Sequence, residues 1–193
     1  CVCVCVCVCA GRMHGKGEKV EENRVYKGKF KADKFHGLGT LTFDSGDTYV
    51  GTFVNGLYQG RGEWTGCGDT YVGEFHQGMR QGVGRLESVE GWVYKGEFFM
   101  GLRHGRGLCV WNNKAYYFGE WYKDMFHGRG TLVGADGTEY EGDFMMGRPH
   151  GFGRKSLLDG TLYLGSFEND QYKGYGAYTW HKAGTENGGT AIE

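Results

Sequence analysis

Proline is nearly absent from this chain, and no stretch of it is long and apolar. The one proline among 193 residues is Pro149, although glycine supplies 38 residues. This imbalance excludes a collagen-like triple helix and a proline-rich linker. No run approaches the roughly 18 apolar residues that a membrane-spanning helix needs. No basic segment followed by an apolar one indicates a secretory signal either.

The chain also lacks an excess of charge of either sign. Its formal net charge is −1, so there is no overall field to hold a polyanion such as DNA, and we expect no nucleic-acid partner. Aromatic residues make up 16% of the chain. Disordered chains lack the apolar groups to offset their ordering entropy, so this content predicts a folded protein.

A disulfide framework is missing as well, despite seven cysteines. Five of them alternate with valine in residues 1–9, whereas Cys67 and Cys109 are isolated. We therefore expect reduced thiols in the cytoplasm. The alternation of Cys and Val predicts a simple β-strand. Translation of a dinucleotide repeat would also produce this alternation. Since no Met begins the chain, we expect that the natural N-terminus lies elsewhere. Metal binding by these five cysteines is the less favoured alternative, because cysteines two apart on a strand lie ~6.6 Å from each other.

What the chain does contain is one pattern repeated seven times. A Tyr-x-Gly-x-Phe/Trp pentad is followed, ten residues after its Tyr, by a tetrad like His-Gly-x-Gly. The successive steps are 23, 22, 23, 23, 23 and 23 residues, and the pentads begin at Tyr26, Tyr49, Tyr71, Tyr94, Tyr117, Tyr140 and Tyr163. A period held this tightly predicts a stacked array of one supersecondary unit.

Each repeat predicts two short strands and two turns. In the Tyr94 repeat, period-2 alternation places Tyr94, Gly96 and Phe98 on one face, and Lys95 and Glu97 on the other. A tight turn follows each pentad, at Asp33, Gly56, Gly78, Gly101, Asp124, Gly147 and Asp170. After the second strand comes another turn, for example at residues 44–46 and 135–137.

Three glycines at fixed places in each repeat need a physical reason, because glycine is a poor strand residue. A missing side chain lets a large neighbouring group lie flat against the backbone. We therefore expect the aromatic rings of each hairpin to cover the glycines of adjacent strands. The core would then be a row of aromatic–glycine contacts along an all-β, elongated antiparallel sheet. The sequence shows no helical periodicity.

The pattern Tyr-x-Gly-x-Phe/Trp-x-x-Gly-x-x-His-Gly-x-Gly resembles the MORN repeat. The match departs at Gln59, Gln81 and Lys173, which replace the His. The resemblance implies an extended antiparallel β-sheet of consecutive β-hairpins, a MORN repeat array, and no particular activity. We divide the chain into an N-terminal strand and degenerate half-repeat (1–25), seven repeats (26–176) and a C-terminal cap and tail (177–193).

No residues stand out as catalytic, cofactor-binding or metal-binding. The tetrad histidines recur about 10 Å apart along such a ladder, whereas zinc ligands converge within ~2 Å of one ion. We expect these histidines to form hydrogen bonds at the hairpin bend. The Gly-x-Gly pairs open no helix and so do not predict a phosphate loop. We expect neither an enzyme nor a small-molecule substrate.

Charged residues recur in the repeats as well. Glu97 and Glu120 hold the fourth pentad position, and Arg106 and Arg129 follow the first tetrad glycine. A regular hairpin would pair Glu97 with Arg106 and Glu120 with Arg129, each worth roughly 0.2–1 kcal/mol. We favour a solvated face over a partner-binding stripe for these charges.

Aromatic residues outside the consensus are the candidates for binding protein partners, because Trp and Tyr often anchor interfaces. We select Trp64, Trp92, Trp111, Tyr116, Tyr122 and Trp180. Together they suggest a long face along which a partner helix could lie.

The favoured function is a non-catalytic scaffold that binds partner proteins within a multisubunit assembly. The resemblance points to cytoskeletal assemblies, in particular the radial spoke heads of the axoneme in cilia and flagella. The alternative is a membrane-associated tether or phospholipid-binding module, as in junctophilins. That role needs a basic face or a lipid anchor, and the near-zero net charge disfavours it.

Overall fold

The computed structural model describes residues 3–5, 8–9, 11–180 and 189–192, and these form β-strands and turns only. It divides into two compact units. The first comprises Cys1–Gly91 with Glu97–Leu102, and the second comprises Trp92–Gly96 with Arg103–Glu193. No helix in the described part of the chain could span a membrane.

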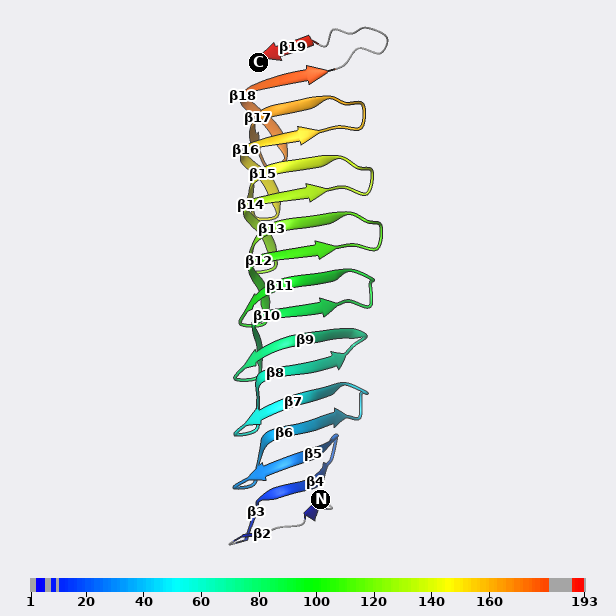
Figure 1. The fold of residues 1–193 in the computed structure, drawn as a ribbon, viewed down its shortest axis with the longest axis vertical. Coiled ribbons are helices and arrows are strands. Elements are labelled where there is room, and N and C mark those ends of the chain that lie inside the picture. Colours follow the sequence, from blue (N-terminus) through cyan, green and yellow to red (C-terminus); the bar gives the residue numbers. More distant parts are fainter. Residues whose placement is uncertain (1–2, 6–7, 10, 181–188, 193) are drawn as a thin grey trace. The chain divides into compact units, whose positions relative to one another are not determined.

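The first unit is an antiparallel sheet in which β4 to β10 pair in sequence order (Figure 1). The short β1 pairs with β4, and β2 pairs separately with β3. The strands are β1 (Cys3–Cys5), β2 (Val8–Cys9), β3 (Arg12–Met13), β4 (Gly15–Glu21), β5 (Arg24–Lys31), β6 (Lys34–Phe43), β7 (Thr48–Val54), β8 (Leu57–Gly66), β9 (Asp69–His76) and β10 (Met79–Glu87). β11 (Val93–Phe99) contributes residues to both units.

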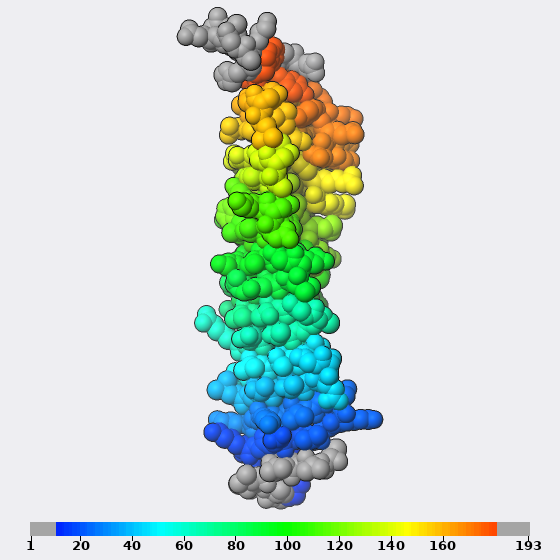
Figure 2. Space-filling model, turned by 90° about the vertical axis from the view of Figure 1, so that its right-hand side faces the viewer, coloured from blue at the N-terminus to red at the C-terminus, as the bar shows by residue number. Residues whose placement is uncertain are grey.

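The second unit repeats this arrangement, with β12 to β19 paired antiparallel in sequence order. In each unit the colours of the space-filling view change in sequence order, because every hairpin lies beside its neighbours in the chain (Figure 2). The strands are β12 (Leu102–Val110), β13 (Tyr116–Tyr122), β14 (Met125–Val133), β15 (Glu139–Met145), β16 (Arg148–Ser156), β17 (Leu162–Glu168), β18 (Gln171–Trp180) and β19 (Gly189–Ile192). The predicted all-β sheet of consecutive antiparallel hairpins is confirmed.

The core of each repeat is a tyrosine ring lying on two glycines. Tyr117 lies over Gly119 of its own strand and over Gly130, which faces Gly119 on β14. A Cβ atom added to Gly119 would lie only 2.6 Å from the tyrosine Oη. The same arrangement recurs at all seven tyrosines, so the predicted aromatic–glycine core is confirmed.

Other aromatic rings surround each tyrosine. Phe126 stacks on Tyr117 with ring centroids 3.9 Å apart, and Trp121 meets it edge-on at 5.2 Å. The Tyr117 hydroxyl donates a hydrogen bond to the Glu120 carbonyl oxygen at 2.8 Å. Because the buried hydroxyl keeps an acceptor, the ring can be buried without an unsatisfied polar group.

The tight turns after the pentads have two residues with positive φ, as in a type I′ hairpin turn. Examples are Asn55 and Gly56, at 52° and 88°, and Lys123 and Asp124, at 49° and 66°. Glycine and aspartate tolerate this left-handed conformation better than most residues. The predicted turn positions are therefore confirmed.

The second kind of turn explains the one irregular step of the repeat. Residues 44–46 form a three-residue connection closed by a hydrogen bond from Phe43 N–H to the Asp47 carbonyl oxygen. Between β8 and β9, only Cys67 and Gly68 separate the paired residues Gly66 and Asp69. The turn is one residue shorter here, which accounts for the step of 22 residues.

The segment assigned as a C-terminal cap and tail (177–193) contains a strand pairing. β19 pairs with Ala177–Trp180 of β18. The chain therefore returns to the sheet after residue 182. The repeat pattern could not predict this, because β19 carries no pentad.

Candidate functional site

Alternation along the strands gives the sheet two different faces. In each unit, we call the face that carries the pentad tyrosines the tyrosine face. The opposite face, here called the open face, carries the second and fourth pentad positions, such as Phe118 and Glu120 on β13. Rings cover the glycines on the tyrosine face. On the open face, large side chains project without such cover.

A bulge interrupts the strand pairing at six of the tetrads. On β13 and β14, Gly119 faces Gly130 but the next residue, Glu120, faces His127, so that Gly128 and Arg129 lie outside this register. Gly128 has a φ of 54°, and the first glycine of every other full tetrad is also left-handed. These glycines allow the second strand of each hairpin to bend.

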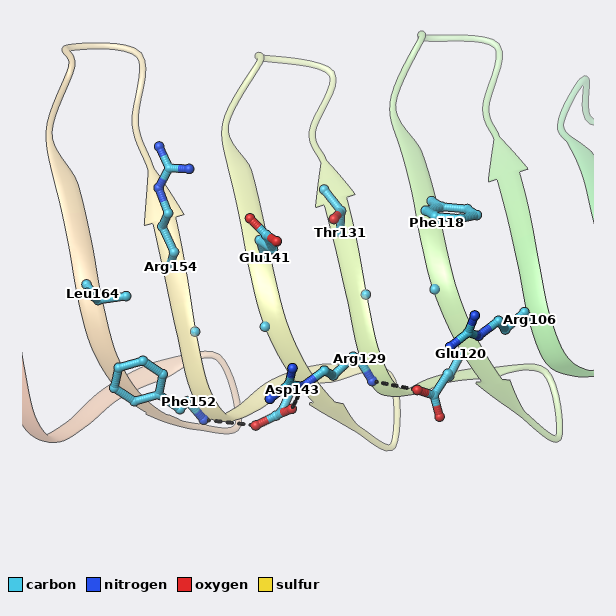
Figure 3. Close-up of a pocket in the computed structure, with 14 residues that line it drawn as sticks. Arg106, Phe118, Glu120, Arg129, Thr131, Glu141, Asp143, Phe152, Arg154 and Leu164 are labelled. Carbon is cyan, nitrogen blue, oxygen red and sulfur yellow. Dashed lines mark hydrogen bonds and ion pairs between the residues drawn. The ribbon is translucent and has the colours of Figure 1, made fainter.

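The carboxylate at the fourth pentad position bonds the backbone of this bulge. Glu120 Oε1 accepts a hydrogen bond from the Arg129 N–H at 3.4 Å, and Asp143 Oδ2 accepts one from the Phe152 N–H at 3.3 Å (Figure 3). These carboxylates therefore stabilise the bulges of their own hairpins.

This geometry corrects the predicted pairing of Glu120 with Arg129. Arg129 faces Asp143 on the following hairpin, with Nε 3.7 Å from Oδ1, and Arg106 faces Glu120 on β13. The prediction assumed a regular hairpin, and the bulge shifts the register by two residues. Arg129 is 89% exposed, so its ion pair contributes little to stability.

The open face of the second unit contains a hollow of about 570 Å³. Phe118, Phe152 and Leu164 lie in it with 58%, 57% and 46% of their surfaces exposed. Its charged lining consists of three arginines and three carboxylates: Arg106, Arg129, Arg154, Glu120, Glu141 and Asp143 (Figure 3). An exposed apolar group with a polar rim is typical of a protein-binding surface.

Four of the six predicted partner-binding residues lie on the tyrosine face. Trp64 faces Tyr49 and Tyr71 on the two neighbouring strands, and Trp180 lies two residues beyond Tyr178, whose ring contacts Tyr163. The Arg103 guanidinium carbon lies 5.3 Å from the Trp92 ring and 4.4 Å from the Trp121 ring. The Trp111 ring meets Phe126 at 6.2 Å. Trp92 and Trp111 therefore pack against other side chains of this face.

Tyr116 and Tyr122 lie on the open face. Tyr122 is 44% exposed, and its ring contacts His104 at 5.2 Å and His127 at 5.5 Å. Tyr116 faces Val110 and Val133. Within the second unit, Tyr116 and Tyr122 thus lie on the opposite face from Trp92, Trp111 and Trp180.

Sequence reasoning missed Phe118, Phe152 and Leu164. They occupy variable positions inside the consensus, whereas the predicted partner-binding residues were all aromatic residues outside it. The alternation of strand residues between the two faces could have identified them, since Phe118 follows Tyr117 and Leu164 follows Tyr163. Residues adjacent to a buried tyrosine on a strand must lie on the other face.

The tetrad side chains bond neighbouring turns in two repeats. Gln59 Oε1 accepts a hydrogen bond from the Gln77 N–H at 3.2 Å, and Gln81 Oε1 accepts one from the Met100 N–H at 3.3 Å. Within the described residues, the buried Nδ1 atoms of His36 and His150 have no hydrogen-bond partner.

The remaining titratable groups do not assemble into a reactive centre. Within residues 3–5, 8–9, 11–180 and 189–192, no group of three or more His, Cys, Asp or Glu side chains could hold a metal ion. Cys109 is a buried free thiol, and burial raises its pKa. A raised pKa disfavours the nucleophilic thiolate.

Comparison with known proteins identifies the repeat. The MORN repeat model matches seven segments: residues 26–48, 49–68, 71–93, 94–116, 117–139, 140–161 and 163–184. No curated protein shows a significant match. A similar solved structure is the TCP domain of SAS-4 (dCPAP) of Drosophila melanogaster in complex with a proline-rich motif of Ana2 (dSTIL). The two share 9% identity over 81% of this chain and 83% of that chain, with a TM-score of 0.47.

Proposed function

Because the chain belongs to the MORN-repeat family, we propose that it is a non-catalytic scaffold that binds partner proteins on the open face of its sheet. The exposed group Phe118, Phe152 and Leu164 is the observation that carries this proposal. These side chains lie on strands that the tyrosine–glycine core already holds in place. Binding there needs no rearrangement of the core, which favours a preformed interface.

We further propose that the partners belong to a cytoskeletal assembly in the cytoplasm, and that the radial spoke head of a cilium or flagellum is the first place to look. This part rests on the resemblance of the repeat array to such structural subunits. The alternative of a membrane tether finds less support in the second unit, where three carboxylates balance the three arginines of the hollow. A membrane-binding surface is expected to carry a clear basic excess.

Affinity purification from ciliated cells, followed by mass spectrometry, would test the proposal. Each identified partner would then be measured with purified protein and with a Phe118→Thr/Phe152→Thr variant. Threonine suits an exposed strand position and Thr131 already lies on this face, so the circular-dichroism spectrum should not change. We expect partner binding to weaken at least tenfold, since large aromatic residues dominate interface energetics.

The matched control is Trp92→Ala/Trp111→Ala, which truncates large rings on the tyrosine face. If the Trp92/Trp111 variant binds the partner more weakly while the Phe118/Phe152 variant binds normally, the open face is not the interface. Recovery of membrane lipids without axonemal or other cytoskeletal proteins would contradict the proposed assembly.

A further inference from the structure

In several repeats, a long or acidic side chain at the fourth pentad position lies over the tetrad bulge. A Cβ atom added to Gly151 would lie 2.9 Å from Asp143 Oδ2, and one added to Gly128 would lie 2.7 Å from the Glu120 carboxyl carbon. The Glu74 carboxylate lies over Gly82 in the same way. In these three repeats, a carboxylate of the chain itself therefore lies over the bulge.

The first repeat reverses the charge at this place. Lys29 stands at the fourth pentad position, and a Cβ atom added to Gly37 would lie 3.1 Å from its Cδ atom. The lysine stem thus lies over the bulge as the carboxylates do. Leu38 corresponds to Arg129 and Phe152, whose N–H groups donate to carboxylates, but an ammonium group has no acceptor for such a hydrogen bond.

A second lysine stands directly across the strands. Lys16 of β4 faces Lys29 of β5, and both side chains are exposed. Like charges in directly opposite positions destabilise a sheet. The nearby Glu18 carboxylate lies 3.4 Å from Lys27 Nζ. Among the described residues, neither Lys16 nor Lys29 forms an ion pair.

The two lysines border a hollow on the open face of the first unit. Its volume is about 600 Å³, and its other side chains are Leu38, Thr40 and Val50. Leu38 is 69% exposed and Val50 is 50% exposed. Glycines form the remainder of the lining, so the backbone is accessible between the lysines and the apolar side chains. A cationic pair and an apolar wall therefore lie side by side.

We propose that this hollow binds a side-chain carboxylate of an acidic partner segment, with an adjacent apolar side chain of that segment on Leu38 and Val50. The carboxylate would stand at Lys16 and Lys29, beside a tetrad bulge of the kind that Glu120 and Asp143 cover with their own carboxylates in the second unit. Charge complementarity and this internal precedent favour a carboxylate, and the apolar wall favours a peptide over a free anion. The inference deepens the proposed scaffold function and rests on it.

Fluorescence anisotropy with a labelled synthetic peptide of alternating Glu and Leu would test the site. The Lys29→Glu variant supplies the missing carboxylate from the chain itself, as Glu74 and Glu120 do, and removes the repulsion from Lys16, so its stability should equal or exceed that of the natural chain. We expect this variant to bind the peptide at least tenfold more weakly, because it loses one charge-assisted interaction and gains a repulsion. Peptide binding should also weaken with added salt.

Lys95→Glu is the matched control. It makes the same charge change at an exposed position where the Tyr140 repeat carries Glu141, and it should leave peptide binding unchanged. Equal binding by the Lys29→Glu variant and the natural chain would overturn the site. So would a Lys29-dependent response to inorganic phosphate, or to vesicles containing anionic lipid, when the peptide does not bind.

These outcomes separate the site from the scaffold function. If purified partners still require Phe118 and Phe152 but are indifferent to Lys29→Glu, the open face binds proteins and the carboxylate site is wrong. If partners are indifferent to both changes, the proposed function on this face also fails.

Discussion

At the scale of single residues, the pentad tyrosine has the largest role. Its ring covers two glycines on paired strands, and its hydroxyl donates to the carbonyl three residues later, as Tyr26 does to Lys29 at 2.9 Å. Burial raises the pKa of Tyr26, Tyr71 and Tyr140 from 10.0 to about 12. The cause is the loss of hydration of the phenolate in the folded state.

This shift predicts how stability depends on alkaline pH. The folded chain holds the phenol protons more tightly than the unfolded chain does. The tyrosine contribution to the free energy of unfolding is therefore complete below pH ~10 and is lost as the pH rises through ~12. Urea unfolding midpoints across this range should fall, and the fall should be smaller for Tyr140→Phe, which lacks one titrating group. A midpoint that stays constant to pH ~12 would contradict burial of the neutral phenols.

At the scale of the elements, sequence alone predicted the strands, the turns and the aromatic–glycine core. Each depends on local chemistry: alternation fixes the faces, and glycine or aspartate marks a left-handed turn. The bulge was not predicted, because Gly128 and Arg129 leave the β13 register without breaking the spacing of the tetrad. For that reason the sequence-based pairing of Glu120 with Arg129 was wrong, and the residues of the open-face hollow were not recognised as a group.

The core makes a prediction that distinguishes glycine from histidine. Gly119→Val should lower the free energy of unfolding by at least about 1–3 kcal/mol, because the new side chain would overlap Tyr117 and the Gly130 backbone. His104→Gln should have little effect, since Gln59 and Gln81 already hold the equivalent position. Urea denaturation of both variants would measure the difference. If Gly119→Val left the free energy of unfolding unchanged and His104→Gln unfolded the protein, the roles assigned to the glycine and the histidine would be wrong.

At the scale of the whole molecule, the period itself leads to the last prediction. Strands in a sheet lie about 4.8 Å apart, so seven two-stranded repeats stacked in sequence order would extend over roughly 70 Å. A compact protein of 193 residues would instead have a radius of gyration near 16 Å.

We expect small-angle X-ray scattering to return a radius of gyration clearly above this compact value, with a pair-distance distribution skewed toward long distances. The measurement is informative because a repeat array has no closed core: each hairpin contacts only its sequence neighbours, and length grows with every repeat. A partner that lies along the open face would add mass with little increase in length, whereas end-to-end association would lengthen the particle. A monomer with a radius of gyration near 16 Å would contradict the stacked array.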